Sequence, residues 1–195
     1  ANPDHWLLCR GQRDVFLPER RLFGVMTDGM PDDADSAFAS HDAFEEHPDG
    51  YAVTTTAFEG VATASETDAE WATQFTVTVE VPTLDAATAD EVGEAVSDGW
   101  LETLERRLED APKATRASVD LDEFDVVATD GTVTVTYTFT FGSAERAAEV
   151  AKTFVEYVEG TYVEGVIPGY DYVSPVADLV ESASQEGGGG GGTPL

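Results

Sequence analysis

The sequence predicts an α+β fold, a two-layer sandwich in which two helices cover one face of a mainly antiparallel, four-stranded sheet. Two observations support this prediction. Segments in which apolar and polar residues alternate are followed, twice, by a segment in which apolar residues recur every three or four positions. An Asp-Gly dipeptide also joins two alternating segments, and it favours a tight hairpin turn. The expected element order is ββαββα, and strand order within the sheet stays open.

The first two strands are predicted at residues 51–58 and 71–81. Residues 51–58 are rich in Thr and Val, and residues 60–70 are predicted to form a long hairpin loop. From Phe75 to Val81 every second residue is apolar and those between are polar, so one face of this strand should lie in the core. Pro82 ends the strand, because proline cannot donate a hydrogen bond to a neighbour.

The first helix is predicted within residues 85–110. Thr88 and Glu91 fit a capping box, although Asp85 is an alternative N-cap, and Pro112 closes the segment. An apolar stripe runs along this helix at steps of four: Val92, Val96, Trp100, Leu104 and Leu108. Such a stripe predicts that one side of the helix packs on the sheet.

The second hairpin is predicted around Asp130-Gly131, and its second strand, residues 132–141, alternates strictly between threonine and apolar residues. Ser143 is the predicted N-cap of the second helix. That helix also carries an apolar stripe: Ala147, Ala151, Phe154, Val155, Val158 and Tyr162. A short helix is expected after Ser174-Pro175.

Charge divides the chain near residue 25. Residues 1–25 carry four arginines and three acidic residues, a net charge of +1, whereas the whole chain carries −29. We predict that residues 1–25 are an upstream extension and that the protein starts at Met26 or Met30, with a functional basic arm as the alternative. Residues 26–49 then form an acidic lead-in, residues 50–183 a single α+β domain, and residues 184–195 a flexible glycine-rich tail.

The acidic excess narrows the classes of function. The chain has 39 acidic and 10 basic residues, yet its 10 Phe, 6 Tyr and 3 Trp argue against a disordered acidic chain. Self-repulsion at this charge disappears in molar salt, where the Debye length is about 3 Å. We therefore predict a cytoplasmic protein that requires high salt and binds neither nucleic acid nor membrane. Cys9 is the only cysteine, so no internal disulfide can form.

Two groups of residues are candidate binding sites. The first lies on the loop after the second helix: Tyr162, Tyr170, Asp171 and Tyr172. Aromatic residues on a loop held by a rigid sheet are common in binding sites, although they could instead cap the core. The second group is basic: Arg106, Arg107 and Arg116. It could hold a phosphate or an acidic partner, or it could complement a helix C-terminus and nearby acids.

The sequence indicates no catalytic residue, metal site or cofactor. It has neither a G-x-S-x-G nucleophile motif nor a G-x-x-x-x-G-K-[ST] phosphate loop, and the six consecutive glycines near its end follow no predicted strand. Two stretches resemble a family of small acidic haloarchaeal proteins of unknown function, "GWLETLERRLEDAPKATRA" and "EGTYVEGVIPGYDY". The resemblance covers residues 36–183. It implies a haloarchaeal source and a single acidic domain, and it supplies no activity.

These observations favour a non-enzymatic module that binds a protein partner or forms a homodimer. Its working surfaces would be the tyrosine-rich loop and the threonine face that the last strand shares with Thr76 and Thr78. The alternative for the threonine face is that it only meets water, as one face of an antiparallel sheet often does. The alternative is a small-molecule-binding protein or enzyme with a pocket near that loop.

Overall fold

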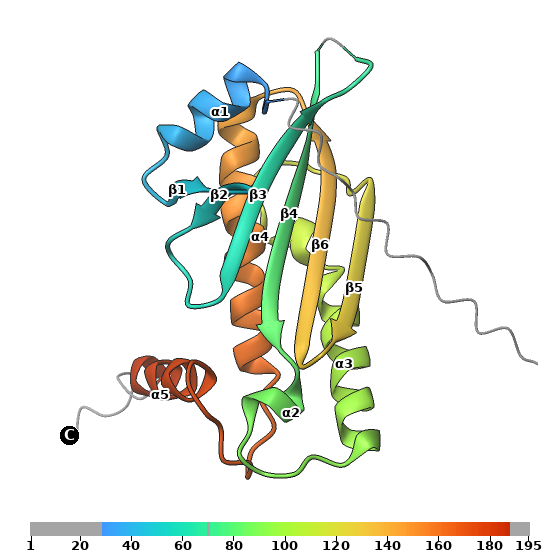
Figure 1. Ribbon diagram of the computed structural model, residues 1–195, viewed down its shortest axis with the longest axis vertical. Coiled ribbons are helices and arrows are strands. Elements are labelled where there is room, and N and C mark those ends of the chain that lie inside the picture. The colour runs from blue at the N-terminus through green and yellow to red at the C-terminus, as the bar shows by residue number, and fades with distance from the viewer. Residues whose placement is uncertain (1–28, 70, 188–195) are drawn as a thin grey trace, which may run out of the picture.

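The computed structural model describes residues 29–69 and 71–187, so the predicted extension over residues 1–25 lies outside the described residues. The strands are β1 (Phe44–His47), β2 (Gly50–Val53), β3 (Glu59–Glu66), β4 (Thr73–Pro82), β5 (Glu123–Thr129) and β6 (Thr132–Phe141). The helices are α1 (Asp32–Ala39), α2 (Leu84–Ala87), α3 (Glu94–Leu108), α4 (Ala144–Glu164) and α5 (Val176–Gly187), with a 3-10 turn, η1 (Ala111–Ala114). They form an α+β fold, as predicted (Figure 1).

The sheet is antiparallel throughout, in the order β1-β2-β3-β4-β6-β5, so the described part of the chain has six strands where four were predicted. The two additional strands are β1 and β3. β1 and β2 form a hairpin that begins inside the segment predicted as an acidic lead-in, and each is four residues long, too short for alternation to be recognised in the sequence. Phe44, Tyr51 and Val53 nevertheless turn inward and are buried.

Only the first residues of the strand predicted at 51–58 form a strand, and the loop predicted after it was wrong. β2 ends at Val53, and β3 forms within the segment predicted as a loop and pairs with β4 along its whole length. The core face of β3 is lined by small residues, so it lacks the apolar alternation that predicts a strand. Gly60 is one of them, and a Cβ atom there would lie 2.4 Å from Cγ1 of Val155 on α4. The close approach of α4 to the sheet therefore explains why this strand is so weakly apolar.

The β5–β6 hairpin agrees with the prediction. Asp130 and Gly131 have φ angles of 52° and 86°, the left-handed conformations that a tight primed turn requires. Along β6 the apolar residues are buried as expected: Val133, Val135, Tyr137 and Phe139. The register places Phe75 of β4 opposite Phe139, and their rings stack with centroids 5.6 Å apart.

The helix predicted within residues 85–110 is divided into α2 and α3. The N-cap of α2 is Thr83, whose side chain accepts a 3.3 Å hydrogen bond from the amide of Ala86. Thr88, a predicted capping residue, instead forms an isolated antiparallel bridge with Tyr172. This bridge holds the backbone extended just after α2, so helical structure resumes only at α3. The division depends on a segment 84 positions away (172 − 88), which local periodicity cannot report.

The helical layer covers one face of the sheet (Figure 1), with α3 and α4 behind the strands and α1 packed beside α4. The described residues contain five α-helices. α3 and α4 are the two long helices predicted, and α5 is the short helix expected after Ser174-Pro175, although it extends to Gly187, into the predicted tail. The other two are α1, in the predicted lead-in, and α2, which is divided from α3. In α4 the predicted stripe is buried, and the amide of Arg146 donates to Oγ of Ser143, confirming the N-cap. Phe154 of this stripe packs on Tyr137 and Phe139 of β6, with centroids 4.8 and 5.5 Å away.

Candidate functional site

The tyrosine-rich loop after α4 is fastened to the chain after α2. The amide of Ala89 donates to the carbonyl of Asp171 at 2.8 Å, and the amide of Val173 donates to the carbonyl of Ala87 at 2.9 Å. The carboxylate of Asp90 accepts a further 2.7 Å bond from the amide of Asp171. The backbone of the loop is therefore fixed at its middle, and the side chain of Asp171 itself is exposed.

The three tyrosines of the predicted site have different environments. Tyr162 lies on α4 rather than on the loop where it was predicted, is 1% exposed, and packs edge-on against Phe58 and Trp100. Its hydroxyl is buried and has no hydrogen-bond partner among the described residues, and burial raises its pKa well above the usual value. Tyr172 closes the loop, because its hydroxyl donates to the carbonyl of Ile167 at 3.1 Å and accepts from the same residue's amide at 2.8 Å.

Tyr170 is half-buried and packs against the core. Tyr162 and Tyr170 therefore contribute mainly to the packing of this end of the fold. The space beneath Tyr162 is filled by Phe58 and Trp100, and neither of the two cavities described below is lined by the three tyrosines. A binding role of the loop stays a prediction, and the arrangement favours the alternative in which the tyrosines cap the core.

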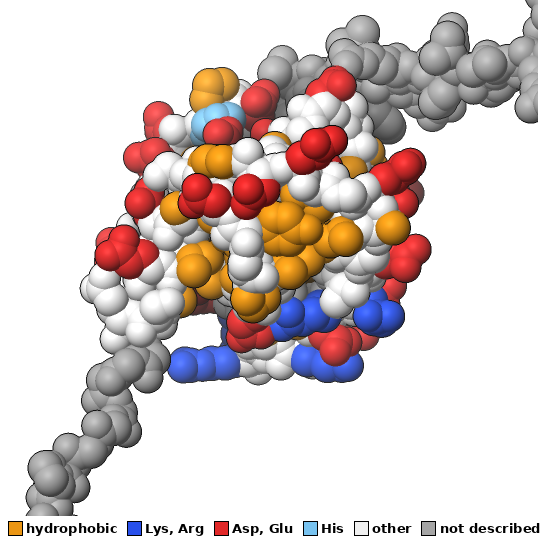
Figure 2. All heavy atoms as spheres, turned by 90° about the horizontal axis from the view of Figure 1, so that it is seen from below, with side chains coloured by type: hydrophobic (Ala, Val, Ile, Leu, Met, Phe, Trp, Pro, Cys, Tyr) orange, Lys and Arg blue, Asp and Glu red, His pale blue; other side chains and the backbone are white. Residues whose placement is uncertain are grey.

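The basic residues gather on the helical side of the molecule. Figure 2, a view from below Figure 1, shows Lys and Arg side chains along one side and acidic side chains spread over the rest of that view. Of the predicted arginines, Arg107 lies at the last turn of α3, where its guanidinium pairs with the carboxylate of Glu164 on α4. Arg106 is exposed. Nearby Lys113 pairs with Asp110 at 2.7 Å. The structure thus gives Arg107 the structural role that was the alternative to ligand binding.

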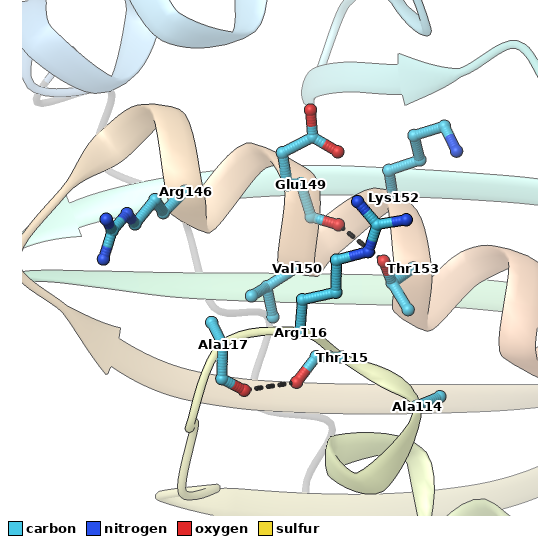
Figure 3. Close-up of a pocket in the computed structure, with 9 residues that line it drawn as sticks. All are labelled: Ala114, Thr115, Arg116, Ala117, Arg146, Glu149, Val150, Lys152 and Thr153. Atoms are coloured by element: carbon cyan, nitrogen blue, oxygen red, sulfur yellow. Dashed lines mark hydrogen bonds between the residues drawn. The ribbon is translucent and has the colours of Figure 1, made fainter.

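Arg116 is the one predicted site residue that lines either described cavity. This cavity has a volume of about 670 Å³ and lies between the chain after η1 and the outer face of α4. It is lined by Ala114, Thr115, Arg116, Ala117, Arg146, Glu149, Val150, Lys152 and Thr153. We call it the η1–α4 cavity. Figure 3 shows Arg116 reaching across it towards α4, whereas Arg146 and Lys152 extend from opposite ends of the same stretch of helix.

Sequence reasoning missed Arg146, Lys152 and the two threonines of the η1–α4 cavity. Arg146 and Lys152 are six positions apart on α4 and about thirty or more from Arg116 in the chain, so no local motif connects them. The one signal in the sequence was that basic residues are scarce, so each of them was a candidate. Six of the chain's 10 basic residues lie in the described part, and three of these six line this cavity. Packing of η1 against α4 brings them together.

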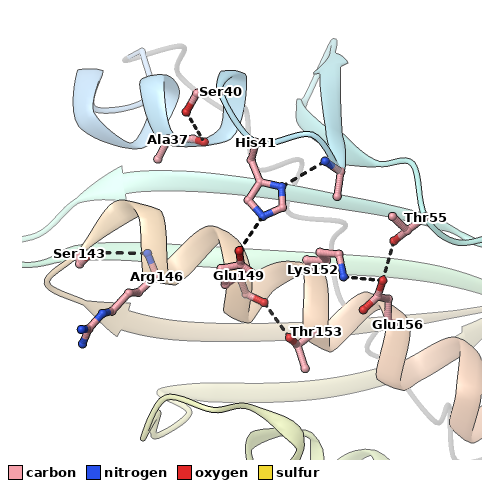
Figure 4. Close-up of polar contacts among 11 residues, drawn as sticks. Ala37, Ser40, His41, Thr55, Ser143, Arg146, Glu149, Lys152, Thr153 and Glu156 are labelled. Carbon is pink, nitrogen blue, oxygen red and sulfur yellow. Dashed lines mark hydrogen bonds and ion pairs between the residues drawn. The ribbon is translucent and has the colours of Figure 1, made fainter.

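Polar contacts link the other side of α4 to the chain just after α1 and to the chain just after β2 (Figure 4). Nε2 of His41 lies 3.2 Å from Oε1 of Glu149, while Nδ1 of His41 accepts from the amide of Ala43 at 3.1 Å. One turn further, Nζ of Lys152 lies 2.7 Å from Oε1 of Glu156. Glu149 and Lys152 are therefore already engaged by neighbouring side chains.

A second cavity, of about 510 Å³, lies between α2, the start of α3 and the β5–β6 turn. Trp100, Leu101 and Val133 line it together with Asp85, Asp98 and Asp130. Its lining is acidic, like the surface of the molecule in general. Among residues 29–69 and 71–187, no three His, Cys, Asp or Glu side chains come close enough together to hold a metal ion. None of the helices in these same residues is long and apolar enough to cross a membrane.

The face of the sheet opposite α3 and α4 is not covered by any described helix (Figure 1). We call it the open face. Strand register places on it Val61 and Thr63 of β3, Thr76 and Thr78 of β4, Thr136 and Thr138 of β6, and, towards its margins, Glu59, Glu80, Glu123 and Asp125. Thr138 is itself buried. The predicted threonine face is thus present in the structure.

A family model matches residues 39–182, well over half of the chain. The chain belongs to DUF5813, a family of unknown function. Comparisons with the curated proteins and with the solved structures found no match. The DUF5813 match begins at the end of α1 and finishes inside α5, so it includes the whole sheet, the η1–α4 cavity and the tyrosine-rich loop. Membership of this family agrees with the resemblance seen over residues 36–183. It assigns no activity to the η1–α4 cavity or to the tyrosine-rich loop.

Proposed function

We propose that this DUF5813 protein is a non-enzymatic binding module that works in a salt-rich cytoplasm and associates with a second copy of itself through the open face. One observation carries the proposal. Acidic residues make up 39 of the 195 positions, yet the centre of the open face has no charged residue. Depletion of charge at the centre, with charge kept at the rim, is the compositional mark of a protein interface.

The uncharged centre extends across three neighbouring strands. Val61 of β3, Thr78 of β4 and Thr136 of β6 lie side by side, and their row ends at Asp125 on the edge strand β5. The next row repeats the arrangement with Thr63, Thr76, Thr138 and Glu123. Threonine and valine present methyl groups on this surface, and two such faces can pack with the sheets about 10 Å apart.

The acidic rim makes this association dependent on salt. Two copies that meet through the open face bring Glu123 and Asp125 of each copy towards the other's carboxylates, and like charges oppose contact in dilute buffer. In molar KCl the Debye length of about 3 Å screens this repulsion. Self-association should therefore strengthen as KCl rises. Binding of a basic partner protein, the alternative occupant of the face, should weaken instead.

Sedimentation equilibrium at about 0.1 M and about 3 M KCl tests the proposal, since these concentrations bracket the screening range. We expect a dimer at high salt and a shift towards monomer at low salt. Thr136→Lys, in the centre of the open face, should remove the dimer, whereas Thr103→Lys, an exposed position on α3, adds the same charge and should leave it intact. Circular dichroism confirms that both variants fold. A monomer at every salt concentration, or equal dimerisation of the two variants, refutes self-association through this face.

A further inference from the structure

We propose that the η1–α4 cavity binds a small molecule that carries both an oxyanion, such as a phosphate or carboxylate group, and hydroxyl groups. Arg116 would hold the oxyanion, and Arg146, whose side chain extends from the other end of the same stretch of α4, would turn towards it. The cavity volume of about 670 Å³ lies within the range of small-molecule sites. The cavity is on the helical side of the sheet, so this inference is independent of the proposed self-association.

The first argument is the state of the two arginines. Within residues 29–69 and 71–185, neither Arg116 nor Arg146 has a carboxylate within ion-pair distance, although the chain has 39 acidic residues. Arg107, Lys113 and Lys152 all have such a partner. Both guanidinium groups therefore keep their donors for a ligand, and the planar fork of arginine suits the paired oxygens of a phosphate or carboxylate.

The second argument concerns Glu149, whose carboxylate would repel an anion in the cavity. His41 draws this carboxylate away. Because Nδ1 of His41 accepts a hydrogen bond from the amide of Ala43, the ring proton of the neutral side chain is on Nε2, which faces Oε1 of Glu149 at 3.2 Å. Figure 4 shows the carboxylate of Glu149 turned towards His41, and Figure 3 shows it directed away from the arm of Arg116. His41 thus acts as a positioning residue that leaves the two arginines as the main charges of the site.

The third argument identifies the rest of the ligand. The hydroxyl of Thr153 donates to the carbonyl of Glu149 at 2.8 Å, and that of Thr115 donates to the carbonyls of Pro112 and Ala117 at 2.8 and 2.6 Å. Their protons are committed, so at the cavity wall both oxygens can act only as acceptors. A ligand with its own hydroxyl groups can donate to them, whereas a bare anion cannot. A phosphorylated or carboxylated polyol fits both halves of the site.

Titration of the full chain with three anionic probes and one uncharged control, followed by amide NMR at constant high KCl, tests this inference. Glycerol 3-phosphate and glycerate carry both groups, sulfate carries only the anion and has no hydroxyl proton at neutral pH, and glycerol serves as the uncharged control. We expect saturable shifts confined to residues 114–117 and 146–153, with either polyol anion binding more tightly than sulfate, and glycerol causing none. The stronger of the two polyol anions identifies the preferred oxyanion.

Variants separate specific binding from general charge. Arg116→Gln and Arg146→Gln should each weaken binding about tenfold or more, the loss typical for one charge-assisted contact. Arg106→Gln removes the same charge from the helical side outside the cavity and should change affinity less than about twofold. Glu149→Gln should tighten binding several-fold. All four positions are exposed, and unchanged melting temperatures verify the fold. Absence of saturable shifts with both polyol anions, or equal losses in the Arg106 and Arg116 variants, overturns the proposal.

Discussion

Removing the hydroxyl group of Tyr162 should make the protein more stable. The oxygen is buried without a hydrogen-bond partner among the described residues, in a side chain that is 1% exposed. A buried hydroxyl without a partner costs about 1–3 kcal/mol in proteins. Tyr162→Phe keeps the ring and its edge-on contacts with Phe58 and Trp100. We therefore expect the free energy of unfolding to rise by about 1–2 kcal/mol, allowing for relaxation around the unpaired group.

Tyr137→Phe is the matched control. Its hydroxyl is also buried, but it donates to the carbonyl of Leu108 at 3.1 Å at the end of α3. Removing it breaks this bond and leaves a buried carbonyl with one partner fewer, so the free energy of unfolding should fall by about 1 kcal/mol. The same chemical change at two buried tyrosines is thus expected to have opposite signs.

The two hydroxyls also predict how stability changes in alkali. Burial raises the pKa of Tyr137 and of Tyr162 well above the ordinary value near 10, so the folded protein keeps protons that the unfolded chain loses. The stability that this provides is complete below pH 10 and declines above it, by up to about 1.4 kcal/mol per pH unit for each group. Each Phe variant should therefore lose stability less steeply than the parent above pH 10.

Equilibrium unfolding in urea at fixed high KCl, followed by circular dichroism, measures both effects. An unchanged dependence on urea concentration in both variants shows that the change lies in stability rather than in the compactness of either state. If Tyr162→Phe loses stability as Tyr137→Phe does, the hydroxyl of Tyr162 has a partner, such as a buried water or a ligand. The reasoning from an unsatisfied group would then be refuted.

Three further predictions concern the fold. Gly60→Ala should lower the free energy of unfolding by about 1–3 kcal/mol because its methyl group meets Val155. Gly99→Ala, with open space around its Cβ position in α3, should raise the free energy of unfolding by up to about 1 kcal/mol. Equal melting temperatures of the two variants would contradict both expectations. The hydrogen bond to Asp35 raises the pKa of Tyr51 to about 12, so the difference in tyrosinate absorbance between parent and Tyr51→Phe should show one group titrating near pH 12 rather than 10. Asp90→Ala should speed hydrogen exchange at the amide of Asp171, and an unchanged rate would show that the loop does not depend on this bond.

Local patterns predicted the elements whose side chains alternate or recur regularly. β6 and α4 are examples, because each buries large apolar residues on one face only, and the turn at Asp130-Gly131 needs just two residues that tolerate positive φ. β3 was not predicted, because its residues do not alternate in this way. Its core face is built from small residues where α4 approaches closely, and that approach is a property of the packed layers.

The candidate site shows the same limit. Sequence reasoning selected Arg116 as a member of a basic cluster beside Arg106 and Arg107, which are its neighbours in the chain. In the structure Arg107 pairs with Glu164, while Arg116 shares a cavity with Arg146, some thirty positions further on. Aromatic content likewise drew attention to Tyr162 and Tyr172, which turn out to be used in packing and in closing a loop.

The sequence by itself determined the acidic character, the α+β class, the strongest strand and helix, and the tight turn, because each depends on composition or on residues within one or two turns of one another. Tertiary structure alone decided the six-stranded sheet, the division of α2 from α3, and which of the few basic side chains line a common cavity. These depend on contacts between segments dozens of residues apart, and no local periodicity records which segments will meet.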